Sequence, residues 1–165
     1  MSDPLRLAIM KALTGIIETA VADTPSGNLV GRVKRGRLIF GEGDPIPMVS
    51  ILEPPTLIDA LDAPVDSTTR PAEWDVLIQG WSKDDKEFPT DPAYVLQADV
   101  GKVLAAEKHR QRGTSPRDLL GLGKRVTEML IGPPVIRPPD QDSAKACFYM
   151  VVRLKMAEDL ANPFV

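Results

Sequence analysis

The stretch Asp44-Pro-Ile-Pro-Met-Val-Ser-Ile-Leu-Glu-Pro-Pro55 is a short apolar segment with proline on both sides. Proline has no N–H to give to a sheet ladder and restricts the residue before it, so these prolines predict where a strand begins and ends. Alternate side chains point to opposite faces of a strand. We therefore expect Met48, Ser50 and Leu52 on one face, Val49 and Ile51 on the other, and the strand at the centre of a small sheet.

A basic segment comes directly before this strand. Residues 29–40 have the composition of a strand or hairpin arm and carry four cations, Arg32, Lys34, Arg35 and Arg37. Turn residues follow in Gly41-Glu-Gly-Asp44, so two antiparallel strands are the simplest prediction. The cations form either a solvated face or a contact for phosphates or an acidic partner. Because they stand out in a chain of net charge -3, they are candidate interface residues.

The sequence predicts two main helices. Asp3 can cap the first, Pro4 suits its first position, and apolar residues recur at helical spacing from Leu5 to Ala20. Asp91-Pro92 repeats the cap-then-proline signal and predicts a second helix that runs to about Lys108. Their apolar stripes are expected to pack against a sheet.

Two further regions predict strands. In Glu73–Trp81, one face has Trp74, Val76 and Ile78 and the other has Asp75 and Gln79, as in a core strand. The last third of the chain predicts a closing antiparallel pair, formed by Val126–Ile131 and Ala146–Met156. In the second of these, alternate residues from Ala146 to Met156 are apolar, so one face is expected to be buried.

Between these regions, residues 54–72 predict a long proline-rich loop that carries Asp59, Asp62 and Asp66. Loops of this length inside a small protein are commonly functional or ordered by a partner, and plain flexibility is the alternative. The three aspartates are candidates for the acidic surface that meets the basic segment of a neighbouring subunit.

Composition limits the class of protein. The chain has 165 residues, 43% of them hydrophobic and 26% charged, which predicts a single folded domain over residues 1–165. The elements predict an α/β protein of the α+β type: a small mixed, mainly antiparallel sheet covered by two main helices, with a C-terminal β-hairpin. A net charge of -3 argues against a general nucleic-acid binder. The single cysteine, Cys147, cannot form an intramolecular disulfide, so a reducing cytoplasm is expected. No apolar run is long enough for a bilayer and no leader pattern opens the chain, so neither standard secretion nor membrane insertion is expected.

The sequence carries no catalytic, cofactor or metal signature. Gly121-Leu-Gly-Lys-Arg125 lacks the first glycine and the hydroxyl of a phosphate-binding loop. The single cysteine, Cys147, and the single histidine, His109, cannot build a structural zinc site. The acidic run Asp84, Asp85 and Glu87 does not have the spacing of a calcium loop. We therefore expect no cofactor, no metal and no enzymatic activity, with a small intracellular enzyme whose carboxylates meet only in the fold as the alternative from another class.

The order of these segments resembles the tail terminator, or tail completion, proteins of long-tailed bacteriophages. The resemblance lies in an N-terminal helix from Pro4 to Val21, a basic strand, the strand Ile46–Ile51, Trp74–Trp81, the segment Asp91–Val100 and a closing hairpin. It covers most of the chain and rests on layout and segment character, without an invariant signature. The family has no catalytic residues to carry over.

The resemblance implies a structural virion protein that forms a ring, expected to be a hexamer, at the head-proximal end of the tail tube. Such a ring stops tube polymerisation and joins the head connector, so the implied partners are further copies, the tail tube protein and the head-tail connector protein. DNA would pass through the lumen without specific binding. The implied location is the neck of the virion, after assembly in the host cytoplasm. A head-to-tail connector or stopper subunit of the neck is the closest alternative.

Overall fold

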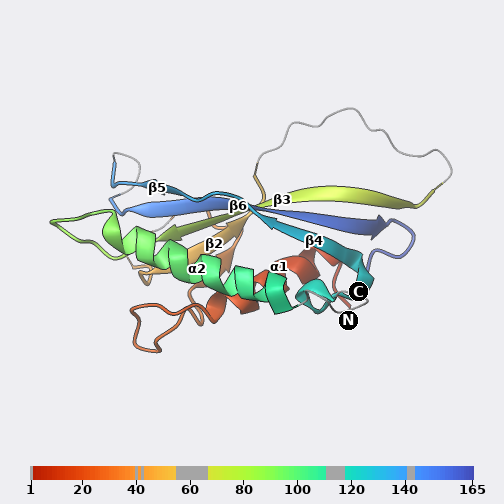
Figure 1. Ribbon diagram of the computed structural model, residues 1–165, viewed down its shortest axis with the longest axis horizontal. Helices are drawn as coiled ribbons and strands as arrows, with labels where there is room; N and C mark the ends of the chain where they lie inside the picture. The colour runs from red at the N-terminus through yellow and green to blue at the C-terminus, as the bar shows by residue number, and fades with distance from the viewer. Residues whose placement is uncertain (1, 40, 42, 55–66, 111–117, 141–143) are drawn as a thin grey trace.

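The computed structural model of the protein describes residues 2–39, 41, 43–54, 67–110, 118–140 and 144–165. Within these residues, six strands form one sheet and two helices lie along one of its faces (Figure 1). The helices are α1 (Leu5–Glu18) and α2 (Asp91–Arg110). The strands are β1 (Val33–Arg35), β2 (Met48–Leu52), β3 (Thr69–Trp81), β4 (Val126–Ile131), β5 (Val135–Arg137) and β6 (Cys147–Asp159). The predicted α+β class, mixed sheet and closing hairpin are confirmed.

The sheet has the strand order β1-β2-β3-β6-β4, and β5 also pairs with β6. β1 and β2 run parallel, whereas every other pair is antiparallel. The longest ladder joins β3 to β6 along the full length of both strands, from the pair Thr69–Asp159 to the pair Trp81–Cys147. β4 and β5 share the other edge of β6, one at each end, so β6 is a central strand although it comes last in the chain.

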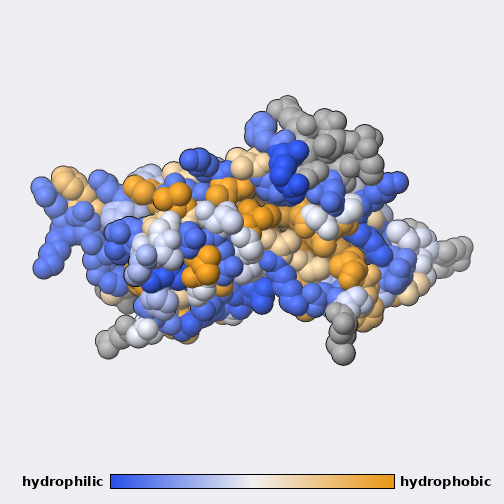
Figure 2. Space-filling model, turned by 90° about the horizontal axis from the view of Figure 1, so that it is seen from below, coloured by the Kyte–Doolittle hydropathy of each residue, from blue (hydrophilic) through white to orange (hydrophobic). Residues whose placement is uncertain are grey.

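The two faces of the sheet differ in what covers them. On the helix side, Trp74, Val76 and Ile78 of β3 are buried against the apolar stripes of α1 and α2. Those stripes consist of Leu5, Ile9, Leu13 and Ile17 in α1 and Leu96, Val100 and Leu104 in α2. No described helix covers the opposite face, where Asp75, Leu77 and Gln79 are only half-buried. In Figure 2, which views the molecule from the helix side, apolar patches alternate with hydrophilic surface.

Two features fix the helices and the sheet together. The Glu158 carboxylate of β6 accepts hydrogen bonds from Arg6 of α1 (2.8 Å) and Arg70 of β3 (2.8 and 2.9 Å), and the Arg6 guanidinium lies 5.1 Å from the centre of the Trp74 ring. Within the helix layer, the buried Glu107 of α2 accepts the Leu120 N–H at 3.0 Å, which ties residues 119–121 to the end of α2. These contacts join segments that are far apart in the sequence.

Close packing explains why residue 80 of β3 is a glycine. Gly80 of β3 lies under the fully buried Phe148 of β6, and a Cβ atom at position 80 would lie 2.3 Å from the Phe148 ring. Any larger residue at position 80 would therefore have to displace the Phe148 ring.

The structure corrects several expectations. β1 and β2 are parallel and not antiparallel. The connection after Arg35 returns to the end of the sheet at which β1 begins, and β2 then starts there at Met48. β2 lies next to the edge strand, so the sheet centre is formed by β3 and β6 and not by the proline-flanked strand. β3 begins at Thr69, inside the predicted 54–72 loop, and β5 was not expected.

The start of α1 also differs from the expectation. Pro4 is the N-cap residue, and no side chain caps the helix. Asp3 instead forms an ion pair with Lys11 at 2.8 Å. A lysine two turns into the helix therefore takes the carboxylate that was expected to accept a backbone N–H.

Candidate functional site

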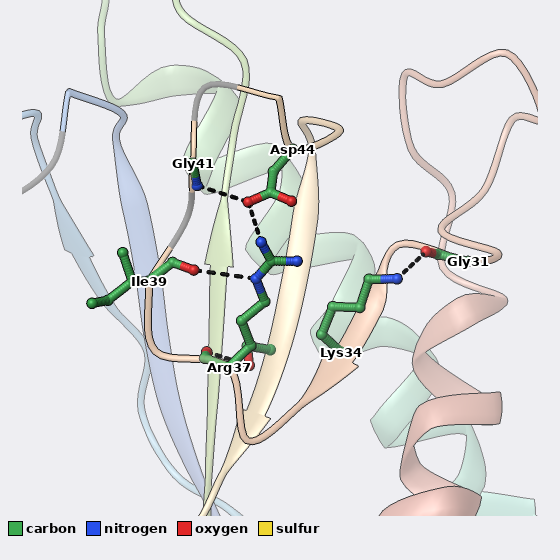
Figure 3. Close-up of polar contacts among 7 residues, drawn as sticks. Gly31, Lys34, Arg37, Ile39, Gly41 and Asp44 are labelled. Carbon is green, nitrogen blue, oxygen red and sulfur yellow. Dashed lines mark hydrogen bonds and ion pairs between the residues drawn. The ribbon is translucent and has the colours of Figure 1, made fainter.

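The four cations of the basic segment do not form one continuous face. Lys34 and Arg35 belong to β1, in register with Ser50 and Ile51 of β2, so their side chains leave the strand on opposite faces of the sheet. Lys34 Nζ donates to the Gly31 carbonyl at 3.0 Å (Figure 3). Among the described residues, no hydrogen bond or ion pair involves the exposed Arg35 side chain. Arg35 is therefore the cation best placed to meet another molecule.

The other two cations serve the fold. Arg32 is half-buried, with its guanidinium 3.5 Å from the Pro47 carbonyl. Arg37 donates from Nε to the Ile39 carbonyl at 3.2 Å and forms an ion pair with Asp44 (Figure 3). We conclude that Arg37 is mainly a structural residue of the segment that joins β1 to β2.

The Arg37–Asp44 pair shapes an apolar tip. The Asp44 carboxylate also accepts the Gly41 N–H at 2.7 Å, and the fully buried Ser50 donates to the Arg37 carbonyl at 2.7 Å. Between these anchors, Leu38 is 72% exposed and Ile39 is 80% exposed. These hydrogen bonds fix the backbone on both sides of Leu38 and Ile39, whose aliphatic side chains remain exposed to solvent. Exposed aliphatic side chains on a fixed backbone mark a candidate contact surface.

A groove lies beside this tip on the helix-free face. It has a volume of about 820 Å³, and its floor is formed by side chains of β3 and β6 such as Gln79, Trp81 and Tyr149. Leu38 and Ile39 form one wall, and the segment after β5 with Arg137 forms the other. The groove therefore continues the exposed apolar tip onto the open sheet.

A row of ion pairs crosses the far end of the helix-free face. Arg153 of β6 hydrogen-bonds Asp75 of β3 through two nitrogens, at 2.7 and 2.9 Å, and Lys155 lies 2.9 Å from Glu128 of β4. The hydrogen bonds from Arg153 lower the pKa of the Asp75 carboxyl below its ordinary value. The charges at this end of the face neutralise one another in ion pairs, so the surface offers little net attraction to either DNA or protein.

The remaining sequence candidates are placed as follows. Asp59, Asp62 and Asp66 lie outside the described residues.

His109 is exposed near the end of α2. The Asp85 carboxylate accepts the Glu87 and Phe88 N–H groups, so Asp85 stabilises a turn. Burial raises the pKa of the Cys147 thiol above its ordinary value, which keeps it protonated at neutral pH.

Metal-binding clusters and membrane-spanning helices are both absent from the described residues. No group of three or more His, Cys, Asp and Glu side chains there lies close enough together to hold a metal ion. None of the helices described has the length and apolar character that crossing a membrane requires.

Sequence reasoning singled out the cations but missed the tip and the groove. Leu38 and Ile39 looked like part of a strand, whose apolar residues are usually buried. The available signal was the Arg37–Asp44 spacing across two glycines, which suits a looped connection as well as a hairpin turn. Neither a protein-family model nor a curated protein sequence matches the chain.

Proposed function

We propose that this protein is a ring-forming structural subunit of a phage neck, acting as a tail terminator at the head-proximal end of the tail tube. The observation that carries the proposal is the pair of different surfaces on one small sheet. One is the edge strand β1 with Arg35, whose side chain has no partner among the described residues, and the other is the open face with the groove beside Leu38 and Ile39. A closed ring of identical subunits needs two such different patches, because each contact is head-to-tail.

The open sheet face supports a role in assembly. In the part of the chain that the structure describes, helices cover one face of the sheet, and exposed aliphatic residues lie beside the other face. The partners in the proposal are further copies of the chain, the tail tube protein and the head-tail connector protein. DNA passes through the lumen without specific binding, and the protein is located in the virion neck after assembly in the host cytoplasm.

Size and shape in solution test the proposal. Light scattering during size-exclusion chromatography should give an integral number of 18.0 kDa chains, expected to be six, and electron microscopy should show rings with a central hole. A protein that stays monomeric at high concentration, alone and with tail tube protein present, contradicts the ring.

Tail length separates the terminator from its closest alternative. In a phage that carries this gene, loss of the protein should give tails of abnormal length if it terminates tube growth. Tails of normal length that fail to join heads would instead assign the protein to the connector or stopper.

A charge reversal tests whether Arg35 lies in the contact. Arg35→Glu should prevent ring formation and leave the unfolding midpoint close to that of the unchanged protein, because the side chain has no partner to lose among the described residues. Lys102→Glu is the matched control, since Lys102 is exposed on α2, away from β1. Equal loss of rings in both variants would show a net-charge effect and remove Arg35 from the interface.

A further inference from the structure

The turn before α2 presents an aromatic side chain on a fixed backbone. The Phe88 N–H donates to the Asp85 carboxylate at 2.8 Å, and the Phe88 carbonyl accepts the Asp91 N–H at 3.1 Å. Both backbone groups of Phe88 are therefore held, yet the residue is 55% exposed. A large aromatic side chain presented in this way is typical of an anchor that fills a pocket on a partner.

The first turn of α2 extends this apolar surface. Tyr94 and Val95 are both exposed, close in sequence to Phe88. Among the described residues, neither the Glu87 nor the Asp91 side chain has a hydrogen bond or an ion pair. With the exposed Lys86 beside them, the surface keeps a net negative charge. We call it the α2 patch, and it consists of Glu87, Phe88, Asp91, Tyr94 and Val95.

The groove on the helix-free face has the opposite charge. Of the charged residues in its lining, Asp44 pairs with Arg37, Lys145 pairs with Asp84, and Asp140 also has an interaction within the chain. Arg137 is exposed, and no hydrogen bond or ion pair holds its side chain among the described residues. The charge left without a partner in the groove is therefore a cation.

The rest of the lining suits apolar side chains. Trp81 and Tyr149 provide an aromatic floor, and Leu38 and Ile39 provide an aliphatic wall. A volume of about 820 Å³ accommodates several side chains of a partner. An apolar surface that carries carboxylates at its rim is thus the complement of this groove.

We propose that the groove of one copy binds the α2 patch of a second copy, with Phe88 as the anchor and Arg137 facing Glu87 and Asp91. This inference rests on the proposed ring function and specifies what enters the groove. It adds this contact to the one at the β1 edge.

The positions of the two surfaces explain why the patch comes from another copy. α2 lies on one face of the sheet, whereas the groove opens on the other (Figure 1). A chain therefore cannot place its own Phe88 in its own groove. Two different surfaces on opposite sides of one chain give a head-to-tail contact, which is the kind that a ring repeats.

Crosslinking between chains tests the contact without requiring a ring. One chain carries Ala98→Cys, one turn beyond the α2 patch, and a second, tagged chain carries Ala144→Cys in the groove lining; both alanines are exposed. A short bismaleimide should join these chains in at least tenfold higher yield than it joins Ala144→Cys to Ala106→Cys, because Ala106 is exposed about 12 Å further along α2. Equal yields would overturn the inference and leave the groove to a different partner. The buried Cys147 is present in all of these chains, so the unchanged chain gives the background.

Removing the anchor tests the role of Phe88. Phe88→Ser in the Ala98→Cys chain keeps the backbone hydrogen bonds and should lower the yield at least tenfold. Leu7→Ser is the matched control, since Leu7 is an exposed apolar residue of α1, and it should leave the yield unchanged. Equal yields in the two variants would overturn the anchor.

A charge exchange tests the choice of partner surface. Arg137→Glu in the Ala144→Cys chain should lower the yield several-fold, and Glu87→Arg in the other chain should restore it. A yield that does not respond to Arg137→Glu would overturn the charge pairing that selects the α2 patch.

The ring and this contact can fail separately. If the unchanged chain forms rings while Ala98→Cys and Ala106→Cys crosslink equally, the groove contact is wrong and the ring function stands. Specific crosslinking by a chain that forms dimers or open filaments supports the contact and contradicts the ring.

Discussion

Replacing Glu158 with glutamine should destabilise the protein measurably. The carboxylate receives three hydrogen bonds from two arginines, and its side chain is only 12% exposed. Hydrogen bonds to charged groups contribute roughly 1.5–3 kcal/mol each where they are buried. Arg6 and Arg70 are 44% and 37% exposed and can be hydrated after the change, so we expect a loss of about 1–2 kcal/mol.

Urea unfolding followed by tryptophan fluorescence measures this loss, because Trp74 lies beneath Arg6. The melting temperature should fall by roughly 2–4 °C per kcal/mol in a protein of this size. Asp75→Asn is the matched control. It also removes a carboxylate paired with an arginine, but the Asp75 side chain is 25% exposed, more than that of Glu158, so the loss should be smaller. A Glu158→Gln variant as stable as the unchanged protein would refute the reasoning.

The same variant has a defined pH dependence. Burial alone raises the pKa of Glu158, but the hydrogen bonds from Arg6 and Arg70 outweigh it and hold the pKa below the ordinary value of 4.5. A lowered folded-state pKa stabilises the protein above the unfolded-state pKa, and this stabilisation is lost as the pH falls through the folded-state value. The stability difference between the two proteins should therefore be constant near neutral pH and shrink below about pH 4.5. A difference that persists unchanged to pH 3 would contradict the ionic origin.

Two further sets of variants test the packing and the tip. Gly80→Ala should lower the free energy of unfolding by about 1–3 kcal/mol, because the added Cβ meets the Phe148 ring. Gly15→Ala, on the exposed side of α1, should instead raise it by about 0.5–1 kcal/mol. Urea unfolding measures both variants, and equal effects would contradict the predicted overlap. Ser50→Ala should leave the Arg37 carbonyl without its donor and lower the free energy of unfolding by about 1 kcal/mol. Amide hydrogen exchange at Leu38 and Ile39 should become faster. Unchanged exchange would show that Ser50 does not hold the tip.

Much of the fold could be predicted because its signals are local. The alternation from Ala146 to Met156 matches the buried face of β6, and the Trp74, Val76 and Ile78 face of β3 is buried as expected. The second helix begins at Asp91, where the cap-then-proline signal placed it. Each of these patterns reflects a period that a single element imposes on its own residues.

The direction of β1 could not be predicted, because it depends on contacts that sequence spacing does not define. Gly41 and Gly43 suit a hairpin, but the Arg37–Asp44 pair and the Ser50 bond to the Arg37 carbonyl instead hold a longer returning connection. β5 is three residues long between proline pairs, so it has too little pattern to identify. The candidate contact surface was found only as charge, because the exposure of Leu38 and Ile39 depends on contacts between residues that are distant in the sequence.

The position of β6 in the sheet has a consequence for how the chain folds. β3, β4 and β5 all pair with this last strand, and the β3–β6 ladder joins residues 66 to 90 positions apart, as between Trp81 and Cys147. Contacts this distant in sequence close large loops before they gain any stabilisation, which slows folding. On the ribosome the complete sheet can form only after β6 has emerged, so the β3, β4 and β5 edges that pair with it remain open through most of the synthesis. Truncation before Cys147 should therefore yield chains that depend on chaperones and are degraded, and no partially active fragment is expected.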